Sequence, residues 1–305
     1  MEAGDYAALV EPIVRVAVCT NRRPAEVAAC LAALLRQVEA GRLVLVTSGL
    51  GRSLIDQHRA SFAGELLIEP RTGLSRARNR ALEGCSQDDV LAYVDDDALV
   101  EDGWWDALSR RWREAAAEVA CIGGPIRPTY TVPAPSWLSP ALLPVLSVLD
   151  MGDRVREVDP RVATVYGANI SFRAGALRAA GGFDPAFGHD RGRVSFSEED
   201  EAQRALARLG HKVLYVPDAG VRHLIARSRL TRRSFVRRRF AYGRTLGRRR
   251  VRTARLAARQ ALSSAVGCLA AALSGRDALA MERAVRSSEN LGVVVELVLK
   301  RRRGG

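Results

Sequence analysis

Three consecutive carboxylates, Asp95, Asp96 and Asp97, follow directly on the apolar residues 91–94. The apolar run predicts a buried β-strand, and ligands of open α/β sheets bind just beyond the carboxyl ends of such strands. Adjacent aspartates repel one another, and a hard divalent metal that also holds a phosphate offsets this repulsion. The triplet is therefore a candidate metal and phosphate site. The alternative is an acidic turn that leads into a helix beginning near Gly103.

A second acidic cluster occupies residues 198–201, directly after Ser197. Ser197 and Asp200 have the spacing of a capping box, which predicts a helix that starts here and continues to Leu209. Acidic residues in the first turn of a helix are electrostatically favoured, and one of them can still point into a cleft. The cluster is thus a helix start and also a candidate source of a catalytic carboxylate.

Length and cysteine usage limit the class of protein. The chain has 305 residues, 48% of them hydrophobic, which is enough for one large core with an appendage or for two domains. The five cysteines include no CxxC pair, which favours a reducing compartment and argues against a disulfide framework or a structural zinc site. The N-terminus is acidic and has no basic region followed by an apolar run, so no secretory signal is predicted.

The net charge of +13 is concentrated in one segment. Between Arg222 and Arg259 there are fifteen arginines and no acidic residue, so the rest of the chain is slightly acidic. A block of this kind binds polyanions, and the candidates are nucleic acid, an anionic membrane surface and a phosphate-bearing substrate.

The elements that must position these residues alternate in the first hundred positions. Short apolar runs predict strands at residues 15–19, 43–47, 65–68 and 91–94. Helices are expected from Pro24 and over residues 74–82. This rhythm predicts a parallel sheet that is covered by helices on both faces.

The middle of the chain is less regular. A helix with three tryptophans is expected to end near Glu118, and a strand follows at residues 119–122. Five prolines predict a non-helical surface loop over residues 128–144. Residues 164–172 predict a strand interrupted by Gly167, which marks a bulge or a close backbone approach. A short helix from near Ala174 and a strand at residues 212–216 complete the pattern.

The C-terminal part, from about Arg227, differs in composition. Phe235, Tyr242 and Leu246 share one helical face, which predicts a basic amphipathic helix, although Gly243 and Gly247 weaken it. Two apolar stretches follow at residues 261–273 and 291–299, and both are shorter than the roughly 20 residues that span a bilayer. Such helices suit an anionic membrane surface, and the alternative is packing on the rest of the chain or between protomers.

Several of these segments, taken in order, resemble the family 2 glycosyltransferases of the GT-A fold. The resemblance is carried by residues 14–37, 73–81 and 93–97, and it continues through residues 167–173, 181–184, the pair Glu199 and Asp200, and His223. It implies an α/β fold of the GT-A type, with a Rossmann-like, mostly parallel sheet, helices on both faces and a C-terminal basic helical extension. It also implies a transferase domain over residues 1–225, with a donor half at about 14–125 and an acceptor half at 126–225. Residues 226–305 form the Arg-rich helical region.

The resemblance also implies roles for individual residues. In the family the triplet is the DxD motif, so Asp95 and Asp97, together with His223, would hold Mn²⁺ or Mg²⁺ at the donor diphosphate. Asp200 would be the general base with Glu199 beside it, and Glu198 offers a second register. Trp137 either stacks on a sugar or anchors its loop. The residues expected at the donor are Thr20, Asn21, Arg22, Arg76, Arg78, Asp95, Asp96, Gly167 and Asn169.

The implied activity is a metal-dependent, inverting transfer from a nucleotide-sugar to a glycan, lipid-linked or small-molecule acceptor. The expected location is the cytoplasmic face of the cell membrane, with the protein bound peripherally and without a nucleic-acid partner. One departure concerns Ser48, because the second strand of the family commonly ends in an aspartate; the nucleobase is therefore not predicted.

Two other functions are open at this stage. The first is a nucleic-acid-binding protein that uses the arginines between Arg222 and Arg259. The second is an inactive relative that binds a nucleotide without transfer, and the presence of Asp95, Asp97 and Asp200 argues against it.

Overall fold

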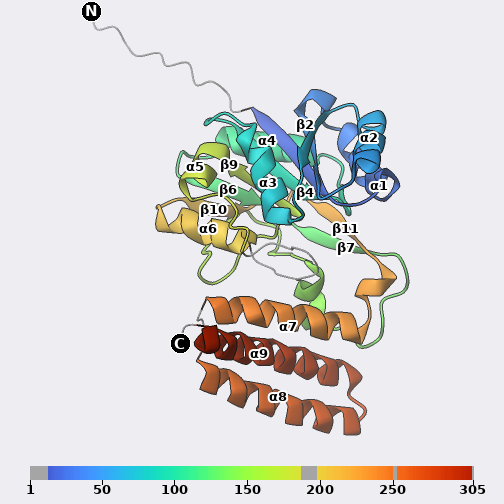
Figure 1. The fold of residues 1–305 in the computed structure, drawn as a ribbon, viewed down its shortest axis with the longest axis vertical. Coiled ribbons are helices and arrows are strands. Elements are labelled where there is room, and N and C mark those ends of the chain that lie inside the picture. The colour runs from blue at the N-terminus through green and yellow to red at the C-terminus, as the bar shows by residue number, and fades with distance from the viewer. Residues whose placement is uncertain (1–12, 187–197, 250–252, 304–305) are drawn as a thin grey trace, which may run out of the picture.

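A computed structural model of the chain describes residues 13–186, 198–249 and 253–303. An α/β body forms the larger part, and three described helices near the C-terminus lie side by side as a layer against it (Figure 1).

The α/β body is built on a mixed sheet, whose described strands follow the order β3-β2-β1-β4-β9-β6-β10-β8. The first four in sequence are mutually parallel: β1 (Val14–Thr20), β2 (Leu43–Ser48), β3 (Glu65–Glu69) and β4 (Val90–Asp95). The others are β6 (Val119–Gly123), β8 (Arg156–Val158), β9 (Asn169–Arg173) and β10 (Lys212–Tyr215). Strand β9 is antiparallel to both neighbours, and β8 is antiparallel to β10. The predicted GT-A type of α/β sheet is confirmed, with these two strands as its antiparallel members.

Helices cover this sheet. They are α1 (Pro24–Leu35), α2 (Arg52–Ser61), α3 (Leu74–Glu83), α4 (Trp104–Glu114), α5 (Ala174–Ala179) and α6 (Glu198–Arg208), and a short 3-10 helix η1 (Ala40–Arg42) precedes β2. Helix α1 begins at Pro24 and buries Val27, Cys30 and Leu34, as its apolar spacing predicts. Helix α2 was not predicted, because His58 is its buried residue and its sequence has no apolar stripe.

A smaller sheet brings a distant segment to the triplet. Its described strands are β5 (Ala98–Val100), β7 (Ile126–Tyr130) and β11 (Val221–Ile225), in the order β5-β11-β7. Strand β11 is antiparallel to β5, and His223 pairs with Ala98. Because Ala98 directly follows the triplet, this register places His223 beside the carboxylates.

Three local predictions need correction. The loop predicted at residues 128–144 includes part of β7 and most of the 3-10 helix η2 (Pro140–Leu146). Pro128 is tolerated in β7 because β7 is an edge strand. The strand predicted at residues 164–172 begins only at Asn169, because side chains, not a neighbouring strand, bind the backbone of Gly167. Helix α4 ends at Glu114 rather than near Glu118. Ser197 and its predicted capping box lie outside the described residues.

The C-terminal region contains a 3-10 turn η3 (Arg227–Arg229) and the helices α7 (Arg232–Arg248), α8 (Ala254–Leu273) and α9 (Asp277–Arg303). Helix α9 packs on both α7 and α8, and α8 is the outermost of the three (Figure 1). Helix α7 is the basic helix that the sequence predicts. Trp137 is buried and packs edge-on against Phe235 of α7, with 5.0 Å between ring centroids, as in the anchor interpretation.

The prediction that both apolar stretches are too short to span a bilayer is wrong for the first. Helix α8 has 20 residues, a mean hydropathy of 1.4 in its most apolar window, and only 11% of that window buried. In the part of the chain that the structure describes, α8 alone is long enough and apolar enough to cross a membrane, by length and composition. One such helix is weak evidence for a membrane span.

Close packing of α7 on α9 depends on two glycines, Gly292 of α9 and Gly243, which was expected to weaken α7. A Cβ added at Gly243 would meet the backbone carbonyl of Glu289, and one added at Gly292 would meet the carbonyl of Phe240. The two helix backbones therefore approach more closely than side chains would allow.

We expect the substitution Gly243→Ala to lower the free energy of unfolding by about 1–3 kcal/mol, because the added methyl group overpacks the interface between α7 and α9. On an exposed helix the same change would stabilise by up to about 1 kcal/mol. Chemical denaturation measures the difference. Gly41→Ala is the control, because a Cβ at Gly41 has no neighbour within 4 Å. Equal stability of Gly243→Ala and the wild type would contradict the close packing.

Candidate active site

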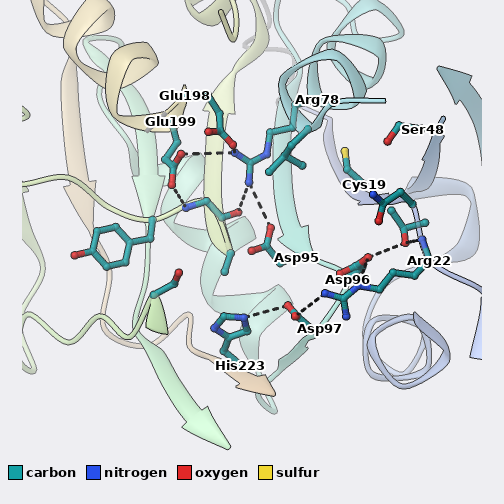
Figure 2. A pocket seen from close by; sticks show the side chains of 18 of the residues that line it. Cys19, Arg22, Ser48, Arg78, Asp95, Asp96, Asp97, Glu198, Glu199 and His223 are labelled. Atoms are coloured by element: carbon teal, nitrogen blue, oxygen red, sulfur yellow. Dashed lines mark hydrogen bonds and ion pairs between the residues drawn. The ribbon is translucent and has the colours of Figure 1, made fainter. Parts of the chain in front are cut away.

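A cavity of about 280 Å³ opens at the carboxyl end of β4 (Figure 2). Ten of the residues predicted from the sequence line it: Thr20, Asn21, Arg22, Arg78, Asp95, Asp96, Asp97, Gly167, Glu199 and His223. They come from β1, α3, β4, α6 and β11 and from the turns beside these elements. The fold therefore brings together residues, such as Thr20 and His223, that are more than two hundred positions apart. We call this cavity the first cavity.

Asp95, Asp97 and His223 have the composition and spacing of a metal site. Each offers a ligand atom, and these atoms lie within 4.8 Å of one another. The Nδ1 atom of His223 lies 3.1 Å from the carbonyl oxygen of Leu146. Nδ1 donates to that carbonyl, and Nε2 faces Asp97 Oδ1 at 3.1 Å, where it can donate to the carboxylate or bind a metal ion. The two carboxylates offer the oxygen ligands that Mn²⁺ and Mg²⁺ prefer, so these residues fit such an ion.

The three carboxylates have different surroundings. Burial raises the pKa of Asp97, but His223, Arg22 and Arg229 together outweigh it and hold that pKa below its usual range. Asp96 instead accepts a hydrogen bond from Thr20 Oγ1 at 2.7 Å. Burial raises the pKa of Asp96 to about 6, and the two neighbouring aspartates add to the shift. Asp96 is thus bound to Thr20 at the end of β1, and it does not belong to the group of possible metal ligands formed by Asp95, Asp97 and His223.

Arg78 connects the triplet to the second acidic cluster. Its side chain is 2% exposed, and its guanidinium lies 3.4 Å from Asp95 Oδ1 and 3.1 Å from Glu198 Oε1 (Figure 2). It also donates to the carbonyl of Gly167 at 3.1 Å. Burial lowers the pKa of Arg78, but the surrounding carboxylates raise it further, so the guanidinium stays charged. Arg78 thereby fixes the spacing of the two acidic clusters.

Gly167 is required at its position by Arg78. An added Cβ would clash with the Arg78 guanidinium, and the Gly167 amide donates to Glu199 Oε1 at 3.3 Å. Burial raises the pKa of Glu199, and the nearby Asp200 adds to this effect. The loop at Gly167 and helix α6 are consequently held together at the edge of the cavity.

A second cavity, of about 450 Å³, adjoins the first. The two share the lining residues Ser147, Tyr166, Glu199 and Arg238. Asp200 lines the second cavity, where it is buried and accepts a hydrogen bond from Thr164 Oγ1 at 2.6 Å. Glu199 thus stands between the cavities, and Asp200 faces the second.

Two residues predicted at the donor are placed elsewhere. The Asn169 side chain is buried and donates to the carbonyls of Pro125 and Ala219, and its Oδ1 accepts from Trp104 Nε1 at 3.1 Å. Neither Asn169 nor Arg76 is among the described lining residues of the two cavities. Their contacts with a donor stay predictions, and the geometry of Asn169 favours a structural role.

The sequence did not identify Arg229 and Arg238 as site residues. Both line the first cavity, and both come from the C-terminal region. The Nη1 atom of Arg229 lies 2.9 Å from His223 Nε2 and 3.8 Å from Asp97 Oδ2. Nothing in the spacing of the arginine block distinguishes these two from its other members. The site therefore crosses the domain boundary predicted at residue 225.

Comparison with known proteins gives a consistent family. The chain matches the family described as "Glycosyltransferase like family 2" over residues 12–245. It is 30% identical over 243 residues to the succinoglycan biosynthesis protein ExoM of Rhizobium meliloti (strain 1021), covering 76% of this chain and 74% of that protein. It is 28% identical over 152 residues to the glucosyl-dolichyl phosphate glucuronosyltransferase of Haloferax volcanii, covering 50% of this chain and 47% of that protein.

Two solved structures share the fold. GalNAc-T7, crystallised with UDP, GalNAc and Mn²⁺, has a TM-score of 0.53 at 15% identity, and the match covers 76% of this chain and 48% of that chain. TarS of S. aureus, residues 1–349, has a TM-score of 0.50 at 12% identity, and the match covers 92% of both chains. At these identities the likeness shows the fold alone.

Proposed function

The chain belongs to glycosyltransferase family 2, and on that basis we propose that it is a metal-dependent, inverting enzyme with a nucleotide-sugar donor. One observation carries the proposal: Asp95, Asp97 and His223 line one cavity, and Asp200 lines the adjoining one. A donor with its diphosphate in the first cavity would direct its sugar toward the second, where an acceptor hydroxyl would meet Asp200.

In this proposal Asp95, Asp97 and His223 would hold Mn²⁺ or Mg²⁺. The bound ion would offset the negative charge that develops on the departing diphosphate. Arg22 and Arg229, which lie 3.1 Å and 3.8 Å from Asp97, are positioned to add positive charge to the same group.

The remaining chemistry falls to Asp200. As base it would take the proton of the acceptor hydroxyl while the hydroxyl oxygen attacks the anomeric carbon and the bond to the diphosphate oxygen breaks. Attack from the face opposite the diphosphate inverts the anomeric configuration. Thr164 donates to Oδ1 of Asp200, and Oδ2, which would accept the proton, lies 3.6 Å from Arg249 and 4.0 Å from Arg204.

The relatives suggest the setting. One is named for succinoglycan biosynthesis and the other as an enzyme of glucosyl-dolichyl phosphate, so we extend the proposal to a glycan or lipid-linked acceptor. The nucleobase is not assigned, because β2 ends at Ser48 where the family commonly has an aspartate, and Ser48 lines the first cavity.

The proposal includes peripheral binding at the cytoplasmic face of the membrane. Four apolar residues of α8 follow one another at i, i+4, i+7 and i+11, and each is more than 60% exposed: Leu262, Val266, Leu269 and Leu273. Helix α8 also carries Arg255 and Arg259 and no acidic residue. An exposed apolar stripe beside arginines suits an anionic lipid surface.

Replacing Leu262 and Leu269 together by glutamate is expected to weaken binding to phosphatidylglycerol vesicles by more than tenfold. Each buried leucine contributes roughly 1.5–3 kcal/mol, and the new charges repel the surface. Co-sedimentation measures the bound fraction, and high salt should release the wild type if binding is peripheral. Leu209→Glu, at an exposed leucine after α6, is the control. Equal binding of the double variant and the control would contradict this role of α8.

Ion pairs within the arginine block argue against the nucleic-acid alternative. Many arginines of the block lie within 4.0 Å of a carboxylate: Arg222, Arg229, Arg232, Arg239, Arg244, Arg248 and Arg249. Much of the positive charge is therefore directed at the protein itself.

A thermal-shift panel tests the proposed function. UDP, GDP, CDP and dTDP are each added with Mn²⁺ or with EDTA, beside a short DNA duplex. A rise in melting temperature that needs both one nucleotide and Mn²⁺ is the expected result. A salt-sensitive rise with DNA, together with no rise for any nucleotide, would overturn the proposal.

A further inference from the structure

The first and second cavities are followed by a third, of about 170 Å³, between η2 and α9. The third cavity shares Pro144, Val145 and Arg239 with the second. The three spaces therefore adjoin in a row that leads from the triplet toward the C-terminal helices. The second cavity, which contains Asp200, is in the middle of this row.

One wall of the second cavity carries two consecutive arginines of α7. Arg238 also borders the first cavity, and Arg239 also borders the third. The Nε atom of Arg238 donates to the carbonyl of Val145 at 3.1 Å. The guanidinium of Arg239 lies over the ring of Tyr242, 4.9 Å from its centroid, and 2.6 Å from Glu289. Both cations are thus fixed in place before any ligand arrives.

The surroundings of Arg238 disfavour its positive charge. Burial lowers its pKa to about 9, and the nearby Arg229 adds to this effect. Two guanidiniums in a partly desolvated space favour an anion between or beside them. Arg204, the other arginine of the described lining, lies 3.3 Å from Glu201 and 4.0 Å from Asp200, and Arg239 is likewise paired with Glu289, at 2.6 Å.

Another part of the lining of the second cavity is mostly aliphatic, with Ser147 and Asp150 as its polar members. It is formed by η2 and the segments after it: Pro144, Val145, Leu149, Met151, Val162 and Ala163. Val162 is 86% exposed, so the apolar lining reaches the protein surface. Tyr166 and Tyr242 supply flat faces nearer to Asp200 and Arg239. A free glycan needs no aliphatic wall, whereas a molecule with a sugar, an anion and a hydrocarbon chain matches all three surfaces.

We propose that the second cavity binds an acceptor whose sugar is joined to a lipid through a phosphate or diphosphate, with the anionic group on Arg238 and Arg239. The sugar hydroxyl lies at Asp200, and the first part of the hydrocarbon lies along Val145 and its apolar neighbours toward the third cavity. This assignment of the acceptor class rests on the proposed function, since it takes Asp200 as the base.

Isothermal titration calorimetry with farnesyl phosphate tests the proposal, and farnesol and inorganic phosphate separate the two halves of the probe. The expected result is that farnesyl phosphate binds at least tenfold more tightly than either, since a hydrogen-bonded charge is lost in farnesol and the apolar contact is lost in phosphate. The titrations are made without nucleotide, because Arg238 also borders the first cavity, where the donor diphosphate would lie. Equal affinity for farnesol would overturn the anion site, and equal affinity for inorganic phosphate would overturn the lipid.

Variants locate the site. Arg238→Gln should weaken farnesyl phosphate at least tenfold, and Arg238→Lys should restore most of the affinity. For Arg239, the double variant Arg239→Gln/Glu289→Gln removes the charge without leaving a buried carboxylate alone, and we expect a similar loss. Glu289→Gln alone should bind as tightly as the wild type or more tightly. Melting temperatures verify that each variant is folded.

Arg237→Gln is the matched control, because Arg237 is an exposed neighbour on α7 with the same change of charge. If Arg237→Gln weakens binding as much as Arg238→Gln, general electrostatics accounts for the effect and the proposal fails. If the protein binds farnesyl phosphate but no nucleotide raises its melting temperature, the proposed function is contradicted and the anion site still stands. The two failures are therefore distinguishable.

Discussion

Replacing Asp200 by asparagine is expected to lower kcat by about 10²- to 10⁴-fold, the usual contribution of a general base. The amide can still accept the hydrogen bond from Thr164, which is 2.6 Å long in the structure, but it cannot take a proton. Asp200 lies in the second cavity, so donor binding in the first should be preserved. Steady-state kinetics with a nucleotide-binding assay separates the two effects.

Two neighbours of Asp200 serve as comparisons. Glu201 forms an ion pair with Arg249 at 2.6 Å and is not among the described lining residues of the cavities, so Glu201→Gln should keep most of the activity. Glu199 borders both cavities. Near-wild-type turnover by Asp200→Asn would contradict the assignment of the base. If Glu199→Gln abolished turnover and Asp200→Asn did not, the base would be Glu199.

Replacing Asp97 by asparagine is expected to remove the Mn²⁺-dependent rise in melting temperature with nucleotide. Loss of a residue that only supports a metal ligand costs 10- to 100-fold in metal affinity, so loss of a direct ligand should cost more than about 100-fold. Asp97 is held ionised by His223, Arg22 and Arg229, and its removal also leaves His223 without its carboxylate partner. Titration with Mn²⁺ at fixed nucleotide measures the affinity.

The triplet provides its own control. Asp96 is bound to Thr20 and Arg22, and it does not belong to the group of closely spaced ligand atoms. Asp96→Asn should therefore cost much less metal affinity than Asp97→Asn. The same loss for both variants would mean that the triplet acts through its total charge rather than through a defined ligand set.

The first half of the fold could be predicted because its elements are local. Strands β1 to β4 are short apolar runs, and α1 has an apolar stripe beginning after Pro24. The position of His223 was not readable in this way, because it depends on the pairing of β11 with β5, more than a hundred residues earlier. The resemblance, not the pattern, pointed to it.

The arginines show most clearly where sequence reasoning stops. Composition identified the basic block, but not that Arg229 would face Asp97 or that Arg238 and Arg239 would line a cavity. These contacts join residues that are far apart in the chain, and every arginine of the block has the same local signature. Likewise, Asn169 carried a family signal, whereas its amide is used by Trp104 and two backbone carbonyls.

The length of α8 was misjudged for a different reason. Arg255 and Arg259 interrupt the apolar composition, so the apolar stretch seemed to begin at residue 261, whereas the helix is continuous from Ala254. The effect of Gly243 was also misjudged. By helix propensity an interior glycine weakens α7, but in the structure Gly243 allows the close contact with α9.

Release of nucleoside diphosphate from a panel of nucleotide-sugars tests the central claim most directly. Each donor is incubated with the full chain in Mn²⁺ or in EDTA, with water as the acceptor of the sugar and Asp97→Asn in parallel, and the released nucleotide is separated and quantified. We predict that one nucleobase class gives release that needs Mn²⁺ and is lost in Asp97→Asn. Release at the same rate in EDTA, or release that persists in Asp97→Asn, would contradict the account.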